Sequence, residues 1–165
     1  MKVETFALGL ALLLAPLICS AQYSYVSYND LKTDLKPSSF VIDVNKKRLV
    51  IGHTWRSINL CDHSSGFECV SSPGTFEFAV KKGSLKVGQS WDVKGRDYSV
   101  IGVDTIRILG LSSKCYLIRS KGDQTIFYYS TERGLLAFRA KSHAGDGFDL
   151  FISTTPYGFP NSPAI

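Results

Sequence analysis

After its first 21 residues this sequence lacks helical periodicity. No stretch of about twelve residues or more there spaces its apolar side chains at the 3.6-residue period of an amphipathic helix. Parallel strands in one sheet need long crossover connections, which are usually helices. The absence therefore excludes a parallel α/β sheet and predicts strands that are mostly antiparallel.

The motifs that commonly identify an enzyme or a nucleic-acid-binding protein are also missing. There is no Gly-x-Ser-x-Gly elbow, and the serines close to glycines, Ser65, Ser84 and Ser90, have ordinary turn neighbours. No recognised nucleic-acid-binding motif, no repeat of solenoid length and no low-complexity segment is present. We therefore predict a non-enzymatic protein with no cofactor, no metal and no nucleic-acid partner.

What the sequence does have is a distinctive beginning. Lys2 precedes an apolar run from Phe6 to Ile18, and the small residues Ser20 and Ala21 follow. A charged start, an apolar stretch and a small-residue cleavage site are typical of a secretory signal peptide. We expect residues 1–21 to be removed after Ala21, which predicts a periplasmic or secreted protein.

Two alternatives remain for this leader. A permanent membrane anchor would need roughly 20 apolar residues, and Pro16 and Ser20 interrupt the run. A bacterial lipoprotein would keep Cys19 as its lipidated first residue, but the preceding Ile18 is larger than the small residue expected there. The sequence favours cleavage and predicts no stable membrane span.

The length and the net charge of the rest of the chain limit what kind of protein it can be. Without its leader the 165-residue chain has the length of one domain, large enough to bury a core without a metal or a disulfide. Its formal net charge is +5, and the basic residues are distributed along the sequence. They indicate either solvated loops and edges, or a basic face for an anionic partner such as a lipid head group, an acidic glycan or an acidic protein.

Three cysteines follow the leader. Cys61 and Cys69 flank a polar segment that can bend back on itself, so in an oxidising compartment we expect them to form a disulfide. Cys115 lies in an apolar run and is expected to be a buried free thiol. A bridge from Cys115 to either of the other two is the alternative pairing.

Short β-rich segments separated by Gly, Asn, Asp or Pro run from residue 40 to residue 154. About nine or ten strands are expected, near residues 40–44, 49–51, 58–60, 76–80, 88–93, 97–101, 116–119, 125–129, 135–139 and 148–153. The fold class is therefore all-β, a single antiparallel meander that forms a small barrel or a two-sheet sandwich. Residues 22–39 are expected to be a helical or irregular lead-in, and residues 155–165 an extended tail.

Two polar loops are the candidate binding regions. The first lies between Cys61 and Cys69, and the second follows the strand expected at 135–139. The candidate contact residues are His63, Phe67, Glu68, His143, Asp146 and Asp149. The preferred hypothesis is an exported binding protein, such as an inhibitor or immunity-type protein, that acts on a partner in the cell envelope. The sequence does not indicate its oligomeric state.

Two other functions stay open. A β-barrel of this size can hold one small apolar ligand, so the protein could carry such a ligand in the envelope. Three histidines, His53, His63 and His143, could instead serve a metal-dependent hydrolase, although their spacing matches no known zinc signature.

Overall fold

The computed structural model describes residues 21–29, 39–62, 64–141 and 147–161, and in these residues the chain forms strands and no helix. The thirteen strands are β1 (Gln22–Asn29), β2 (Ser39–Asp43), β3 (Arg48–Ile51), β4 (Thr54–Ser57), β5 (Asn59–Leu60), β6 (Phe67–Ser72), β7 (Phe76–Lys81), β8 (Ser90–Val93), β9 (Arg96–Ile108), β10 (Leu111–Ser120), β11 (Ile126–Ser130), β12 (Gly134–Lys141) and β13 (Phe148–Ser153). The predicted all-β, antiparallel class is confirmed. No helix long and apolar enough to cross a bilayer occurs in this part of the chain.

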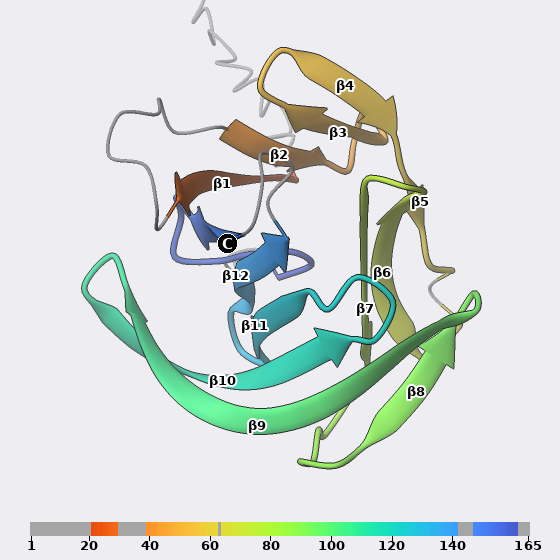
Figure 1. Cartoon of the computed structure of the whole chain (residues 1–165), viewed down its shortest axis with the longest axis vertical. Helices are drawn as coiled ribbons and strands as arrows, with labels where there is room; N and C mark the ends of the chain where they lie inside the picture. The colour runs from red at the N-terminus through yellow and green to blue at the C-terminus, as the bar shows by residue number, and fades with distance from the viewer. Residues whose placement is uncertain (1–20, 30–38, 63, 142–146, 162–165) are drawn as a thin grey trace, which may run out of the picture.

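The strands form two sheets. Ten strands make a large sheet in the order β4-β3-β2-β1-β13-β12-β11-β10-β9-β8, and β5, β6 and β7 make a small one. Most hydrogen-bonded neighbours are consecutive in sequence, as in a meander, and the exception is β1, which pairs with β13. Of the two architectures predicted, the sandwich is the one found, because the large sheet curves without closing into a barrel (Figure 1).

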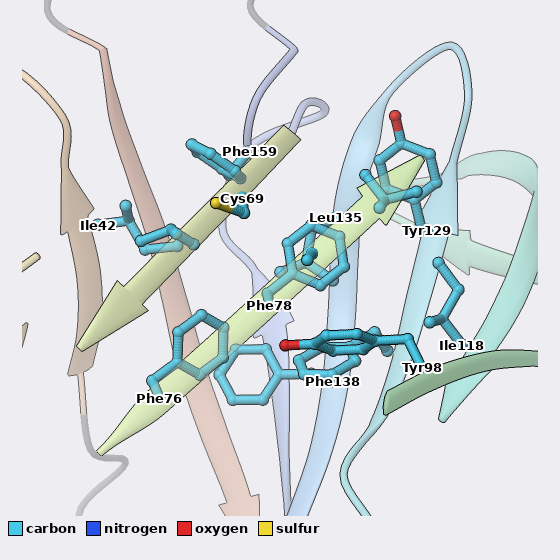
Figure 2. Packing of buried hydrophobic residues seen from close by; sticks show 14 of the residues in the cluster. Ile42, Cys69, Phe76, Phe78, Tyr98, Ile118, Tyr129, Leu135, Phe138 and Phe159 are labelled. Carbon is cyan, nitrogen blue, oxygen red and sulfur yellow. The ribbon is translucent and has the colours of Figure 1, made fainter. Parts of the chain in front are cut away.

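Aromatic rings fill the space between the two sheets. Side chains along β7 point alternately to its two faces, so Phe76 and Phe78, two residues apart, both point into the core. Phe78 lies 4.9 Å from Phe127 of β11, and Phe76 lies 5.0 Å from Phe138 of β12, measured between ring centroids. Figure 2 shows the two β7 rings directed toward Phe138 and Leu135. This ring cluster joins the small sheet to the middle of the large one.

The amino-terminal segment differs from the prediction. Residues 22–29 form strand β1 in the interior of the large sheet, so they belong to the β-domain and are not a helical or irregular lead-in. Tyr23 and Tyr25 are buried on one face, whereas Ser24 and Val26 are only partly buried on the other. The alternation of buried and partly buried side chains could not be recognised in the sequence, because tyrosine has both an apolar ring and a polar hydroxyl group. Residues 30–38 of the predicted lead-in lie outside the described residues.

The end of the described chain packs against the sheet. Phe159 is only 4% exposed, and its carbonyl accepts a 2.8 Å hydrogen bond from the Leu135 amide. The Gly158 amide donates to the Arg133 carbonyl at 2.7 Å. Phe159 is therefore part of the main core, and the tail expected at residues 155–165 packs against the sheet at residues 158–159.

Candidate functional site

The connection between β7 and β8 forms a shallow, open cleft of about 680 Å³. Three of its lining side chains are lysines, and the full lining is Lys81, Lys82, Gly83, Ser84, Lys86, Val87 and Gln89. The lysines come from only six consecutive positions, so the turn concentrates positive charge. A surface of this kind attracts carboxylates, phosphates or sulfates.

Backbone hydrogen bonds and one buried leucine hold the cleft in shape. Leu85 is buried in the main core and anchors the middle of the connection. The Gly88 amide donates to the Val100 carbonyl at 2.8 Å, and the Val100 amide donates back to the Gln89 carbonyl at 2.9 Å. Gly88 has φ +85°, a backbone conformation that favours glycine, so this turn depends on that residue type.

An apolar side chain lies among the lysines. Val87 is 60% exposed and lines the cleft beside Lys86. The amide of Lys86 donates to the Gln89 side-chain oxygen at 3.1 Å, which fixes this turn internally. The cleft therefore combines positive charge with a small apolar contact, a combination suited to a protein surface.

The cleft adjoins the predicted disulfide loop. Cys61 and Cys69 are bonded, as predicted, and Cys115 is free and buried, so the alternative pairings are wrong. The Lys82 amide donates to the Gly66 carbonyl at 2.9 Å, and the Lys82 ammonium lies 3.4 Å from a Glu68 carboxylate oxygen. The disulfide loop thus supports one wall of the basic cleft.

The charges of the cleft are only partly balanced. Glu68 pairs with Lys82, whereas Lys81 and Lys86 are exposed and take part in no ion pair within the described part of the chain. Phe67 is opposite Lys81 in the β6–β7 ladder, and its ring packs against the main core. Of the two described candidate residues in this loop, Glu68 therefore contributes charge to the cleft and Phe67 contributes support.

Of the candidate residues in the second predicted loop, the structure describes Asp149, which lies in β13 of the large sheet opposite Asn29 and Ala140. His63, His143 and Asp146 lie outside the described residues, so their predicted roles remain predictions. No group of three or more His, Cys, Asp or Glu side chains is arranged to hold a metal among the residues described.

Cys115 is the one free cysteine in the described residues, and it is poorly suited to nucleophilic chemistry. It is fully buried beside Ile108 and Leu136 in a second, smaller core on the other face of the large sheet. Burial raises the pKa of its thiol to about 11, and the nearby Arg133 only partly opposes this. The thiol is therefore protonated at neutral pH, and the thiolate is the form that reacts.

Sequence reasoning located the disulfide loop but missed the cleft beside it. The pair Lys81-Lys82 follows directly on the strand expected at 76–80, but Gly88 was assigned to the strand expected at 88–93, whereas β8 begins at Ser90. The convergence of this lysine pair with Lys86 and Val87 depends on how the turn folds over Leu85, which local spacing does not reveal.

No protein-family model, curated protein or solved structure matches this chain. Its function must therefore be argued from its own surfaces.

Proposed function

We propose that this chain is an exported, non-enzymatic protein that binds an acidic partner protein in the cell envelope through the basic cleft between β7 and β8. An inhibitor or immunity-type role fits this arrangement, because the cleft would cover an acidic surface of the partner. The observation that carries the proposal is the gathering of Lys81, Lys82 and Lys86 around an exposed valine, where Lys81 and Lys86 take part in no ion pair within the described residues.

Electrostatics supports a protein partner of opposite charge. The chain carries a net charge of +5, so its overall field attracts acidic surfaces from a distance. Complementary charges raise the association rate and the selectivity of binding more than they raise affinity itself. The exposed Val87 supplies an apolar contact that a purely ionic site for a free anion would not need.

Export is supported by two independent features. The first is the signal-like leader at residues 1–21, and the second is the Cys61–Cys69 disulfide, which is typical of oxidising compartments. The carrier alternative finds less support, because rings pack closely between the sheets, for example Phe40 and Phe76 at 4.8 Å. The hydrolase alternative depends on His53, His63 and His143. His53 is exposed in the turn between β3 and β4, and the hypothesis stays a prediction because the other two histidines lie outside the described residues.

Affinity capture tests the proposal. The immobilised protein is incubated with envelope extract at low and at high salt, and captured proteins are identified. We expect an acidic partner at low salt that is released at high salt, since exposed ionic contacts are screened. The double variant K81S/K86S removes the exposed lysines of the cleft and should lose the partner.

The matched control is K114S/R119S, which removes the same amount of charge from exposed positions on β10. This control should capture the partner as well as the unmodified protein does. Equal capture by K81S/K86S, or capture of no partner at all, would contradict the proposal.

A further inference from the structure

A second surface, on strand β4, has the features of a docking edge. β4 is a terminal strand of the large sheet, and all four of its residues are exposed. It lies at the opposite end of the molecule from the connection between β7 and β8 (Figure 1). An inference about this edge is therefore independent of the proposed cleft function.

The backbone of β4 leaves hydrogen-bonding groups facing outward. The Ile58 amide donates to the Lys47 carbonyl at 3.0 Å, which makes these two residues a hydrogen-bonded pair of the β3–β4 ladder. Such pairs alternate along an antiparallel ladder, so Trp55 and Ser57 occupy the non-hydrogen-bonded positions. Their N–H and C=O groups point away from β3, toward the side where no further strand is paired in the described residues.

Trp55 gives this edge an unusual apolar side chain. It is 66% exposed, the highest value among the large apolar residues in the described part of the chain. It lies opposite Val50, which in turn lies opposite Val41, and both valines are only partly buried. The three side chains share one face of the sheet, so the strip continues inward from the edge.

Exposed edges are normally protected by charge, proline or twist, because they invite pairing with another strand. A tryptophan there has the opposite effect, since a large flat ring is a preferred anchor in protein interfaces. The contrast with Trp91 is direct. That ring is buried, and its indole N–H donates to the Ala79 carbonyl at 3.3 Å.

The charged residues in the sequence around the edge are of one sign. Residues 44–60 contain four basic residues and no Asp or Glu: Lys46, Lys47, Arg48 and Arg56. The nearest carboxylate in sequence, Asp43, is buried and already lies 3.3 Å from Arg48. Lys47 and Arg56 are exposed and take part in no ion pair within the described residues, so the edge presents positive charge.

We propose that β4 is a docking edge for an extended, acidic polypeptide segment of a partner protein. The segment adds as an antiparallel strand whose backbone pairs with Trp55 and Ser57. Successive side chains of β4 point to opposite faces, so Trp55 and Arg56 lie on different faces. The matching segment therefore alternates apolar residues, which pack on Trp55, with Asp or Glu residues, which pair with Arg56.

A second copy of this chain is the less suitable occupant. Edge-to-edge pairing of two β4 strands would place the arginines and lysines of one copy beside those of the other. Like charges placed directly opposite each other in a strand pair destabilise it. The charge pattern therefore selects an acidic strand and disfavours self-association.

Fluorescence anisotropy with a labelled eight-residue peptide of alternating valine and glutamate tests the proposal on the full chain. We expect saturable binding, with Trp55 emission shifting to shorter wavelength as the ring leaves water. The variant Trp55→Ala should weaken binding by about tenfold or more, as truncation of a central tryptophan does. Leu111→Ala, at an exposed apolar position on β10 that belongs to neither basic surface, should leave binding unchanged.

Two further peptides separate strand addition from simple charge attraction. A peptide N-methylated at the positions that would pair with β4 keeps its charge but loses its backbone donors, so it should not bind. A valine–lysine peptide should not bind either. Binding of either peptide at the affinity of the valine–glutamate peptide would overturn the proposal. So would absence of binding by the valine–glutamate peptide, or sedimentation showing that the edge instead pairs two copies of the chain.

Discussion

At the residue scale, Phe138 is the side chain on which the core depends most. It is 1% exposed, and its ring contacts rings from five other positions, Tyr25, Phe40, Phe76, Phe127 and Phe151. These positions belong to both sheets. One side chain therefore connects the two layers of the sandwich.

Replacing Phe138 with alanine should lower the free energy of unfolding by about 3–5 kcal/mol, because the ring leaves a cavity that the surrounding rings cannot fill. Phe138→Leu keeps much of the volume and should cost less. Urea unfolding followed by circular dichroism measures both changes. A loss below about 1 kcal/mol for the alanine variant would mean that the rings are packed loosely.

Asp43 is a buried carboxylate whose charge is satisfied locally. Burial alone would raise its pKa, but hydrogen bonds from the Lys46 amide and the Gln22 side chain, with the Arg48 charge, lower the pKa below the ordinary 3.8. A carboxyl group with a lowered pKa stabilises the folded state above its ordinary pKa. That contribution is lost as pH falls through the pKa of the folded state.

Asp43→Asn should therefore be less stable than the unmodified protein by about 1–3 kcal/mol near neutral pH, since it loses a charged acceptor for buried donors. The difference between the two proteins should stay constant above about pH 5 and shrink below about pH 4. Thermal unfolding measured from pH 3 to 8 checks this. A difference that grows as the pH is lowered would contradict the assigned role.

At the element scale, the segment after β13 is held by an unusually close contact of two backbones. A Cβ atom added to Gly158 would lie 1.7 Å from the Leu135 carbonyl oxygen, and one added to Gly134 would lie 2.0 Å from the Gly158 oxygen. Neither oxygen is at the end of a flexible side chain. The segment packs against β12 only because both positions are glycine.

Gly158→Ala should therefore lower stability by about 3 kcal/mol or more, because the backbone must separate to admit a methyl group. Gly122→Ala is a matched control, since nothing lies within 4 Å of its added Cβ and its φ is not positive. The control should change stability by less than about 0.5 kcal/mol. Differential scanning calorimetry on both variants decides the point, and equal melting temperatures would refute the close contact.

The strands that sequence reasoning identified are those whose burial alternates or whose turns are marked. The turn at Lys94 and Gly95 was predicted from its glycine, and both residues have positive φ. Strand β4 gave no signal, because all of its residues are exposed and nothing alternates. Strand β6 was not expected, because its residues belong to the segment around Cys69 that the sequence indicated as a loop. The pairing of β1 with β13 joins strands far apart in sequence, and no local pattern can indicate such a pairing.

The candidate site was predicted to a similar extent. The disulfide followed from two cysteines close in sequence, and Glu68, named as a candidate contact, forms an ion pair with Lys82. The cleft did not, because it requires Lys86 and Val87 to turn back over the end of β7, where Leu85 enters the core. Asp149 was expected beside a binding loop but lies within a paired strand of the large sheet.

At the scale of the whole molecule, the fold separates two basic surfaces. The connection between β7 and β8, which lines the cleft, and the edge strand β4 lie at opposite ends of the structure (Figure 1). A partner at the cleft would leave the edge accessible, so the two proposals can fail separately. Both surfaces are consistent with the net charge of +5 and with acidic partners.

Hydrogen–deuterium exchange on the complex with the partner captured from the envelope tests the central claim most directly. If the cleft is the binding site, amides of residues 81–89 should exchange more slowly in the complex than in the free protein, because bound surfaces open less often. The β9–β10 hairpin should exchange at the same rate in both. Unchanged exchange at 81–89, with protection confined to other parts of the chain, would contradict the claim.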